Sequence, residues 1–199
     1  MTAFQLKIMT ISLIKNSMQF IVAISLILSC SEHLAGSSDK SMNKGISKDE
    51  FIAMVIGSST SNSDDKLQSK SLWLNDELQV KITKILDHPY SKLRLRYLTN
   101  FKLKQTLWFL DEIGKERPIS FAVSIIDRRV SLMKVLQFRE SRGGEIRMQA
   151  FTDQFNQIGV KSNSKLDLHI DGISGATMSV TAMKKIARLA LMLDVEVRP

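Results

Sequence analysis

The chain has 199 residues, and 44 % of them are hydrophobic, which is enough apolar surface for a folded core and excludes a chain that is disordered throughout. A formal net charge of +8 is typical of proteins that bind nucleic acid or an anionic surface, but the N-terminal residues argue against nucleic acid. The single cysteine excludes a disulfide within the chain.

Residues 1–30 have the pattern of an export signal. Two lysines precede an uncharged apolar run at 20–28, which is much shorter than the roughly 20 residues of a membrane-spanning helix. The run ends in Ile-Leu-Ser-Cys, which resembles a bacterial lipobox with Cys30 as the lipidated residue. We therefore predict a lipoprotein signal peptide at 1–29 and a lipid-anchored protein that faces the periplasm. Ser31 favours the outer membrane over the inner one, and an uncleaved helical anchor is the alternative.

The segment that follows the cysteine is rich in Ser, Asn, Asp and Lys. Such a composition buries too little apolar surface to offset chain entropy, so residues 30–71 are predicted to be a flexible tether. Within it, Ser47 and Glu50 have the spacing of a capping box ahead of apolar residues, which predicts a short helix. The folded domain is expected at 72–199.

The first half of this domain contains one predicted helix and a series of predicted strands. Apolar residues recur at helical spacing before Pro89, namely Leu78, Ile82, Ile85 and Leu86. Alternating apolar and polar residues then predict strands at 92–98, 105–114, 118–127 and 129–140. Asp127 and Arg128 form the expected tight turn between the last two strands.

The second half is predicted to be mainly helical. A helix at 147–158 places Met148, Phe151, Phe155 and Ile158 on one face, and 165–170 is a short extended piece. The last helix, from about 179 to 193, has Val180, Met183, Ala187 and Ala190 on its apolar face, with Lys184, Lys185 and Arg188 turned to water. The fold class is therefore α+β, an antiparallel sheet with packed helices.

The most informative stretch is Asp-Gly-Ile-Ser-Gly-Ala-Thr-Met-Ser at 171–179. Gly172 and Gly175 loosen the backbone, and Ala176 leaves the surroundings of Thr177 open. A phosphate held in this loop would meet free backbone N–H groups and the positive end of the following helix dipole. The pattern by itself indicates an anion site without identifying the anion.

The tetrapeptide Ser174-Gly175-Ala176-Thr177 resembles the flavinylation motif of the FMN-binding domain family. Members include the C subunit of sodium-translocating NADH:quinone reductase, the G subunit of the Rnf complex and stand-alone lipoproteins. The resemblance extends upstream and covers about 93–193. It implies FMN bound as a phosphoester to Thr177, installed by a separate flavin transferase that uses FAD and magnesium.

The resemblance also implies neighbours for the cofactor. Asp171 matches the acid that precedes the motif, and Ser174, Gly175 and Ala176 match its small residues. Glu140 and Arg142, in a stretch that resembles the family's loop before the motif, are expected to be polar neighbours of the flavin.

Other residues leave alternatives open. If extended, the 167–171 segment puts Asp167, His169 and Asp171 on one side, as either a metal-binding face or, in the interpretation we prefer, a solvent-facing edge. Trp108 and Phe138 either flank the flavin ring or, as we prefer, pack in the core. No metal site is predicted.

The expected function is that of an envelope-anchored electron carrier without a substrate of its own. FMN suits this role because it links donors of electron pairs to one-electron acceptors. The donor and the acceptor are not identified by the sequence. Two rivals remain, namely a binding or scaffold lipoprotein that carries no flavin, and an accessory subunit of a flavin-dependent reductase.

Overall fold

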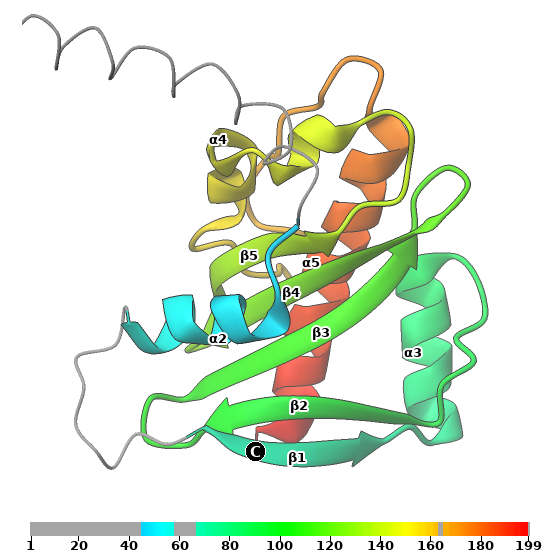
Figure 1. Ribbon diagram of the computed structural model, residues 1–199. Coiled ribbons are helices and arrows are strands. Elements are labelled where there is room, and N and C mark those ends of the chain that lie inside the picture. The colour runs from blue at the N-terminus through cyan, green and yellow to red at the C-terminus, as the bar shows by residue number, and fades with distance from the viewer. Residues whose placement is uncertain (1–44, 58–66, 163–164, 199) are drawn as a thin grey trace, which may run out of the picture. The chain divides into compact units, whose positions relative to one another are not determined.

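An antiparallel sheet organises the described part of the chain, which in this computed structural model comprises residues 45–57, 67–162 and 165–198. Five strands pair with their neighbours in chain order (Figure 1). They are β1 (Gln68–Trp73), β2 (Arg94–Asn100), β3 (Gln105–Ile113), β4 (Pro118–Ile126) and β5 (Arg129–Gln137). The predicted α+β fold with an antiparallel sheet is confirmed. The predicted signal peptide and Cys30 lie outside the described residues.

The predicted turn between β4 and β5 is present. Asp127 and Arg128 connect the two strands with φ angles of 49° and 62°. Positive φ at both central residues is the conformation of a type I′ turn, whose twist matches that of a hairpin. The register of β4 on β5 then places Val123 opposite Met133, and both side chains are buried.

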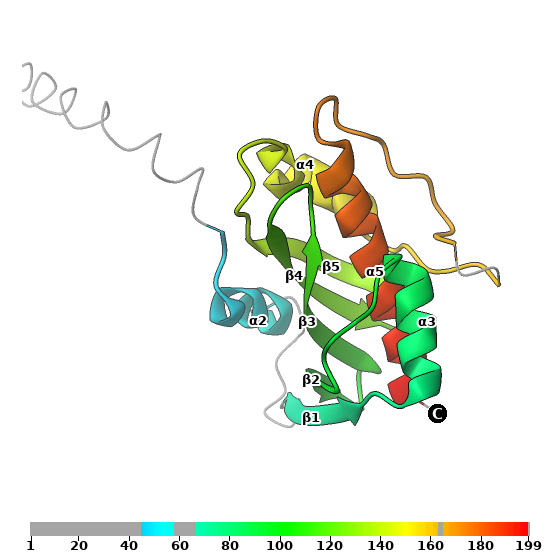
Figure 2. The same cartoon turned by 90° about the vertical axis from the view of Figure 1, so that its right-hand side faces the viewer.

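Two helices, α3 (Asp76–Leu86) and α5 (Thr177–Val197), cover one face of the sheet (Figure 2). The side chain of Asn75 caps α3 by accepting the N–H of Leu78 at 2.9 Å. At the centre of this layer the indole of Trp108 is fully buried and stacks on Tyr97, with ring centroids 4.7 Å apart. Trp108 is thus a core residue, as preferred from the sequence.

The short helix α2 (Lys48–Gly57) covers the opposite face (Figure 2). Its Phe51 and Val55 are buried in a second apolar cluster with Leu107 and Ala122 of the sheet. The predicted capping box is formed, because the N–H of Glu50 donates to Ser47 Oγ at 3.1 Å and the N–H of Ser47 donates to Glu50 Oε2 at 2.6 Å. None of the described helices has the length and apolar character required to cross a bilayer.

The folded structure therefore begins earlier in the chain than Leu72, which the sequence predicted as the first residue of the folded domain. Helix α2 lies within the predicted tether, 30–71, and β1 begins within it at Gln68 and extends past its predicted end. The helix is ordered because two of its apolar residues are buried against the sheet. The strand is held by pairing with β2, while its own sequence, Gln-Ser-Lys-Ser-Leu-Trp, is largely polar and exposed and gives no alternating signal.

The single helix predicted at 147–158 is wrong. This region consists of η1 (Gly144–Arg147), α4 (Gln149–Thr152) and η2 (Asp153–Phe155). Met148, which is 55 % exposed, has extended backbone angles and interrupts the helical path. Ile146, before the interruption, and Phe155, after it, are both buried. A continuous helix would not contain this break.

The last helix also differs from its prediction. It begins at Thr177 and ends at Val197, and two of the lysines assigned to solvent have partners. Lys184 Nζ donates to the carbonyl of Ile170 at 2.8 Å, and Lys185 Nζ lies 3.1 Å from a carboxylate oxygen of Asp87. The predicted extended piece at 165–170 forms only an isolated bridge, between Leu166 and Val160.

Candidate functional site

The loop before α5 places one hydroxyl in an open position. Gly175 has a φ of 78°, a left-handed conformation that glycine adopts without strain. Ala176, which is 3 % exposed, precedes the helix and has no side chain that could cap it. Thr177 is the first helical residue and is exposed. The first N–H groups of an α-helix have no acceptor within the helix, so those of α5 remain available at this end.

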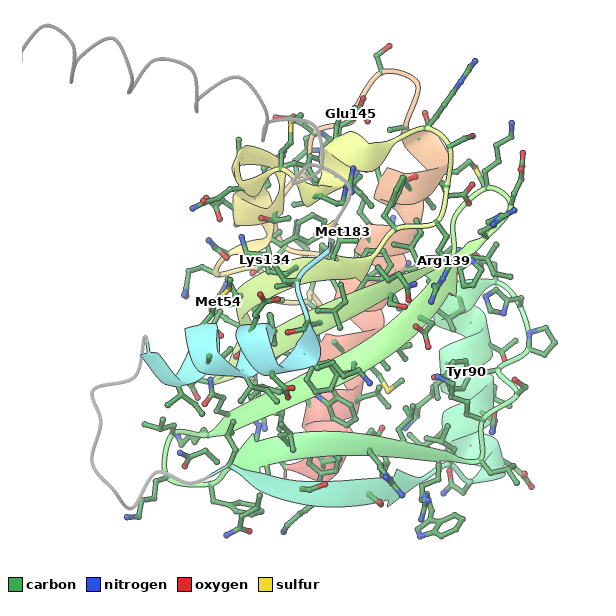
Figure 3. All side chains as sticks on the ribbon, in the orientation of Figure 1. Met54, Tyr90, Lys134, Arg139, Glu145 and Met183 are labelled. Carbon is green, nitrogen blue, oxygen red and sulfur yellow. The ribbon has the colours of Figure 1, made fainter. Side chains whose placement is uncertain are left out.

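An open cavity of about 500 Å³ lies at this helix terminus. Its walls come from three segments that are distant in sequence but converge at one end of the sheet (Figure 1). They are the β3–β4 turn (Lys115 and Glu116), the segment after β5 (Glu140, Ser141 and Arg142) and the start of α5 (Gly175 to Ser179). In Figure 3 the labelled Arg139 and Glu145 lie on either side of the middle segment in the chain.

Glu140 connects two of these walls. Its Oε1 atom accepts the backbone N–H groups of Lys115, Glu116 and Arg117 at 2.7, 2.8 and 2.9 Å. These hydrogen bonds, that of Arg117 foremost, hold the pKa of the Glu140 carboxyl below its usual value. A Cβ atom on Gly114 would lie 2.7 Å from the same oxygen, so a side chain at this position would displace the Glu140 carboxylate. Glu140 therefore shapes the β3–β4 turn.

Gly143 joins the middle wall to α5. Its φ is 88°, and a Cβ atom there would lie 2.7 Å from Ser179 Oγ and 3.2 Å from the Cβ of Ala176. The backbone of the Arg-Gly-Gly stretch can thus pack directly against the first turn of the helix. This contact brings Arg142 to the cavity that Thr177 also lines.

The charged side chains that line the cavity balance formally, Lys115 and Arg142 against Glu116 and Glu140, so the preference for an anion comes from the N-terminus of α5. Lys115 Nζ lies 3.8 Å from Glu116 Oε1, and the carboxylate of Glu140 is occupied by three backbone N–H groups. Arg142 adds a positive charge, and the N-terminus of α5 adds the positive end of its dipole. A phosphate group is the kind of ligand that such a helix terminus holds.

The structure brings together most of the residues predicted from the sequence. Gly175, Ala176 and Thr177 line the cavity, as do Glu140 and Arg142. Two others do not line it: Ser174 is exposed, and the exposed Asp171 has its N–H bound to Gln154 Oε1 at 2.8 Å.

Sequence reasoning missed part of the lining. Lys115 and Glu116 come from a turn about sixty residues before the motif, and no periodicity connects the two. Ser141 lies inside the stretch that was singled out, and Met178 and Ser179 directly follow the motif. Only these last three had a local signal.

The alternative metal face is not assembled. Asp167 accepts the N–H of Gly159 at 2.9 Å and lies 3.0 Å from Arg129 Nη1, so its carboxylate is already bound. His169 Nε2 and Asp171 Oδ1 are 3.7 Å apart, and both side chains are largely exposed. The described residues contain no group of three or more potential metal ligands.

Two further residues have structural contacts. Phe138 is half-buried against the core and lies beneath the guanidinium of Arg147, 5.3 Å from the ring centroid. His88 has its Nε2 atom 3.0 Å from Glu112 Oε2. Neither lines the cavity at the start of α5.

The model of the FMN-binding domain family matches residues 114–192. The matched segment begins at the β3–β4 turn and extends into α5, so it contains all the residues that line the cavity. A search among curated proteins found no match to the chain.

Proposed function

Because residues 114–192 belong to the FMN-binding domain family, we propose that this chain carries FMN covalently on Thr177 and passes electrons at the cell envelope. The observation that carries the proposal is the exposed Thr177 hydroxyl at the edge of a cavity that the family match encloses.

The residues of the cavity fit such a cofactor. Its volume of about 500 Å³ lies within the range of roughly 300–1,000 Å³ that is usual for small-molecule sites. Gly175 and Ala176 present no atoms beyond Cβ beside Thr177, which leaves room for a phosphate on its hydroxyl. The N–H groups of the first turn of α5 and the guanidinium of Arg142 would balance the phosphate charge.

Attachment needs help from outside the cavity. The new bond joins Thr177 Oγ1 to the phosphorus of the FMN moiety, and if FAD is the donor, AMP leaves and the hydroxyl proton is lost. Glu140 is a poor base for that proton, since backbone hydrogen bonds hold its pKa below the usual value. The exposure of Thr177 supports access by a separate flavin transferase with its own magnesium ion.

Once attached, FMN supplies one-electron and two-electron transfer, and the chain holds it and adjusts its surroundings. The covalent bond prevents loss of the cofactor in a compartment where free FMN is scarce. Arg142 and the N-terminus of α5 present positive charge to the cavity, which favours negative charge on whatever it holds. The redox donor and acceptor are separate partners.

Anchoring through Cys30 completes the proposal. The lipobox-like sequence that ends at this cysteine supports export, removal of residues 1–29 and a lipid anchor that holds the domain in the periplasm, with the outer membrane favoured. Nucleic acid is not a proposed partner.

Replacing the acceptor hydroxyl tests the attachment site. We expect Thr177→Ala to be folded and exported but colourless, and to lack the mass increment of about 438 Da that covalent FMN adds by the chemistry of the cofactor. Intact mass and visible absorbance of protein purified from a host that contains the transferase measure both effects.

Thr181→Ala is the matched control, because Thr181 is an exposed threonine one turn further along the same helix. This variant should keep the full increment. Normal flavin content in Thr177→Ala would refute the attachment site. An unmodified wild-type chain in such a host would favour the scaffold alternative, and turnover of an organic acceptor by the purified protein alone would favour the reductase alternative.

A further inference from the structure

A cluster of charged side chains holds the turn that follows α3. Asp87 caps this helix with a φ of 62° and donates its N–H to the carbonyl of Thr83 at 2.8 Å. The chain then runs back along α3 to the start of β2, as Figure 1 shows. Glu112 of β3 and Lys185 of α5 meet the turn from the sheet and from the last helix. The cluster therefore joins three elements that are distant in sequence.

Glu112 is the buried member of the cluster, with a side chain that is 3 % exposed. Its Oε2 atom lies 3.0 Å from His88 Nε2, and its Oε1 atom lies 3.7 Å from Lys185 Nζ. Lys185 also donates to the carbonyl of Leu86 at 2.5 Å and lies 3.1 Å from Asp87 Oδ2. A carboxylate removed from water is costly unless it is paired, so Glu112 depends on its two cationic neighbours.

Both ring nitrogens of His88 face oxygen atoms. Nδ1 lies 3.0 Å from the carbonyl oxygen of Pro89, which can only accept, so Nδ1 carries a hydrogen. Nε2 faces the carboxyl group of Glu112, and a hydrogen bond there requires one more proton, on the ring or on the carboxyl. Both forms hold the same number of protons, and the nearby Lys185 favours the ionised carboxylate. Without this proton, a nitrogen lone pair would face a carboxylate oxygen that is shielded from water.

The surroundings of His88 favour its protonated form. The hydrogen bond to the carbonyl of Pro89 has the largest effect, and the one to Glu112 acts in the same direction. Burial and the charge of Lys185 oppose them, and the pKa of His88 is raised above its usual value of 6.5. Asp87 lies against the same lysine at 3.1 Å.

Tyr90 is a further titratable group in this turn. Burial, together with the carboxylates of Asp111 and Glu112, raises the pKa of its hydroxyl to about 12. The phenol therefore keeps its proton in neutral solution. Histidine is the residue type whose ordinary pKa lies closest to neutrality, which makes His88 the candidate for a change of charge near pH 7.

We propose that the proton shared by His88 and Glu112 is a pH-sensitive latch, which holds the turn after α3 against β3 and α5 and releases it when the proton is lost. The latch stands on the two acceptors that face the imidazole and on the burial of Glu112. Because folding raises the pKa of His88, the stability that it contributes is complete below the unfolded pKa of about 6.5 and is lost as the pH rises through the folded pKa. The latch is thus closed in mildly acidic solution and opens in mildly alkaline solution.

The latch lies on two elements that lead to the first cavity. From Glu112, β3 continues into the turn that carries Lys115 to the cavity. From Lys185, α5 runs back to Thr177, eight residues earlier, or about 12 Å at about 1.5 Å per residue. The latch itself rests on the contacts around His88, whereas its influence on a bound flavin rests on the proposed function.

A proton NMR titration of the full chain tests the latch. The Cε1–H resonance of His88 is identified by its loss in His88→Gln, since the chain has three histidines. We expect a wild-type midpoint above about 6.5 and a midpoint lower by about half a unit or more in Glu112→Gln, because the amide carries no negative charge. Circular dichroism establishes that both variants are folded.

Asp111→Asn is the matched control, because it removes a carboxylate from the neighbouring residue of the same strand. The side chain of Asp111 is 49 % exposed and is bound by Lys92 at 3.1 Å and by Ser120 at 2.7 Å. The midpoint of His88 should move by less than about 0.2 units in this variant. Equal shifts in the two variants would overturn the proposal by showing a general effect of net charge.

Hydrogen exchange of the Asp87 amide measures the opening, because this N–H closes the last turn of α3. The protection factor compares the measured exchange rate with the intrinsic rate at the same pH. We expect the wild-type factor to fall by about threefold from about pH 5.5 to about pH 8.5, as a half-unit shift in pKa requires. The factor should stay constant in His88→Gln, since glutamine does not titrate. A constant factor in the wild type, or an equal fall in the variant, would show that no latch is present.

Thr177→Ala separates the latch from the proposed function. This variant keeps every contact around His88, so it should titrate like the wild type even though it carries no flavin. A failure of flavin attachment in the wild type therefore leaves the result intact. A titration that is seen only in flavin-carrying protein would overturn the proposal, because the proton would then belong to the cofactor.

Discussion

At the scale of single residues, the carboxylate of Glu140 has the clearest structural effect. It accepts three consecutive backbone N–H groups from a turn that lies 23 to 25 residues earlier in the chain. Each of these donors would otherwise turn to water, and together they fix the turn that carries Lys115 and Glu116 to the cavity. From the sequence Glu140 was expected to be a polar neighbour of the flavin. In the structure it also holds the β3–β4 turn in place.

Glu140→Gln isolates the effect of the charge, because the amide has nearly the same shape and can still accept hydrogen bonds. We expect the wild type to have the higher free energy of unfolding at neutral pH, since the folded protein lowers the pKa of Glu140. That advantage is complete above the unfolded pKa of about 4.3 and is lost as the pH falls through the folded pKa. Urea unfolding at a series of pH values measures the difference.

Glu116→Gln serves as the control, because the substitution keeps the backbone N–H that Glu116 donates to Glu140 and removes only a carboxylate that lies 3.8 Å from Lys115 Nζ at the surface. This variant should match the wild type closely at every pH. A difference between wild type and Glu140→Gln that grows toward low pH would contradict the assigned role.

At the scale of elements, the N-terminus of α5 depends on close contact with the Arg-Gly-Gly stretch. The contact has room for a hydrogen atom at Gly143 but none for a methyl group. Ser179 and Ala176 supply the other side, and both are buried. The helix end is therefore held by packing between backbone and small side chains, while its N–H groups stay open at the cavity.

Gly143→Ala should disturb this junction. The added methyl group meets Ser179 Oγ at 2.7 Å, and alanine is strained at a φ of 88°. We expect a loss of about 1–3 kcal/mol in the free energy of unfolding together with reduced flavin content. Gly172→Ala, in the loop before the motif, is the control because its Cβ would meet nothing within 4 Å. Equal stability and equal flavin content of the two variants would show that the contact has no influence.

At the scale of the whole described structure, the sheet separates two apolar layers of unequal size. The larger layer contains α3 and α5, and the smaller one contains α2 (Figure 2). The family match begins at residue 114, so α2 and β1 to β3 precede it. These elements nonetheless complete the sheet and cover its second face.

Phe51→Ala tests the contribution of the smaller layer. Phe51 is fully buried, and replacing such a residue by alanine typically lowers the free energy of unfolding by about 3–5 kcal/mol. Ile56→Ala, at a position that is 49 % exposed on the same helix, should change it by no more than about 0.5 kcal/mol. Urea unfolding measures both, and equal effects would show that α2 does not pack as described. Flavin content should stay normal in both, because α2 lies across the sheet from α5.

The sequence predicted the central strands and both major helices because their burial follows simple periods. Leu95 and Tyr97 alternate with Arg94 and Arg96, and burial in β2 follows the same alternation. β1 was not predicted because it is stabilised by pairing with β2 and not by burial of its own side chains. Met148 was misplaced because its spacing fits a helix, whereas the local backbone leaves the helical path there.

The cavity was predictable to the extent that its signal is local. The Gly-Ala-Thr turn can be identified in the sequence by its small residues before a helix, and the match to the FMN-binding domain family covers the same residues. The position of Lys115 at the cavity could not be predicted, since it depends on hydrogen bonds between Glu140 and a turn that is distant in sequence. The pairing of Lys185 with Asp87 was hidden for the same reason, because it joins two helices across the tertiary fold.

The docking of α2 on the sheet has a consequence for the reach of the molecule. If Cys30 is acylated, only residues 31–44 separate the lipid from the packed structure that begins at Gly45, and 14 residues at about 3.5 Å each span at most about 50 Å. A stretch free up to Leu72 would span nearly three times that distance. With such an anchor, the packing of α2 would limit how far above a bilayer the domain can operate, and inserting residues between Cys30 and Gly45 would raise that limit without altering a contact in the core.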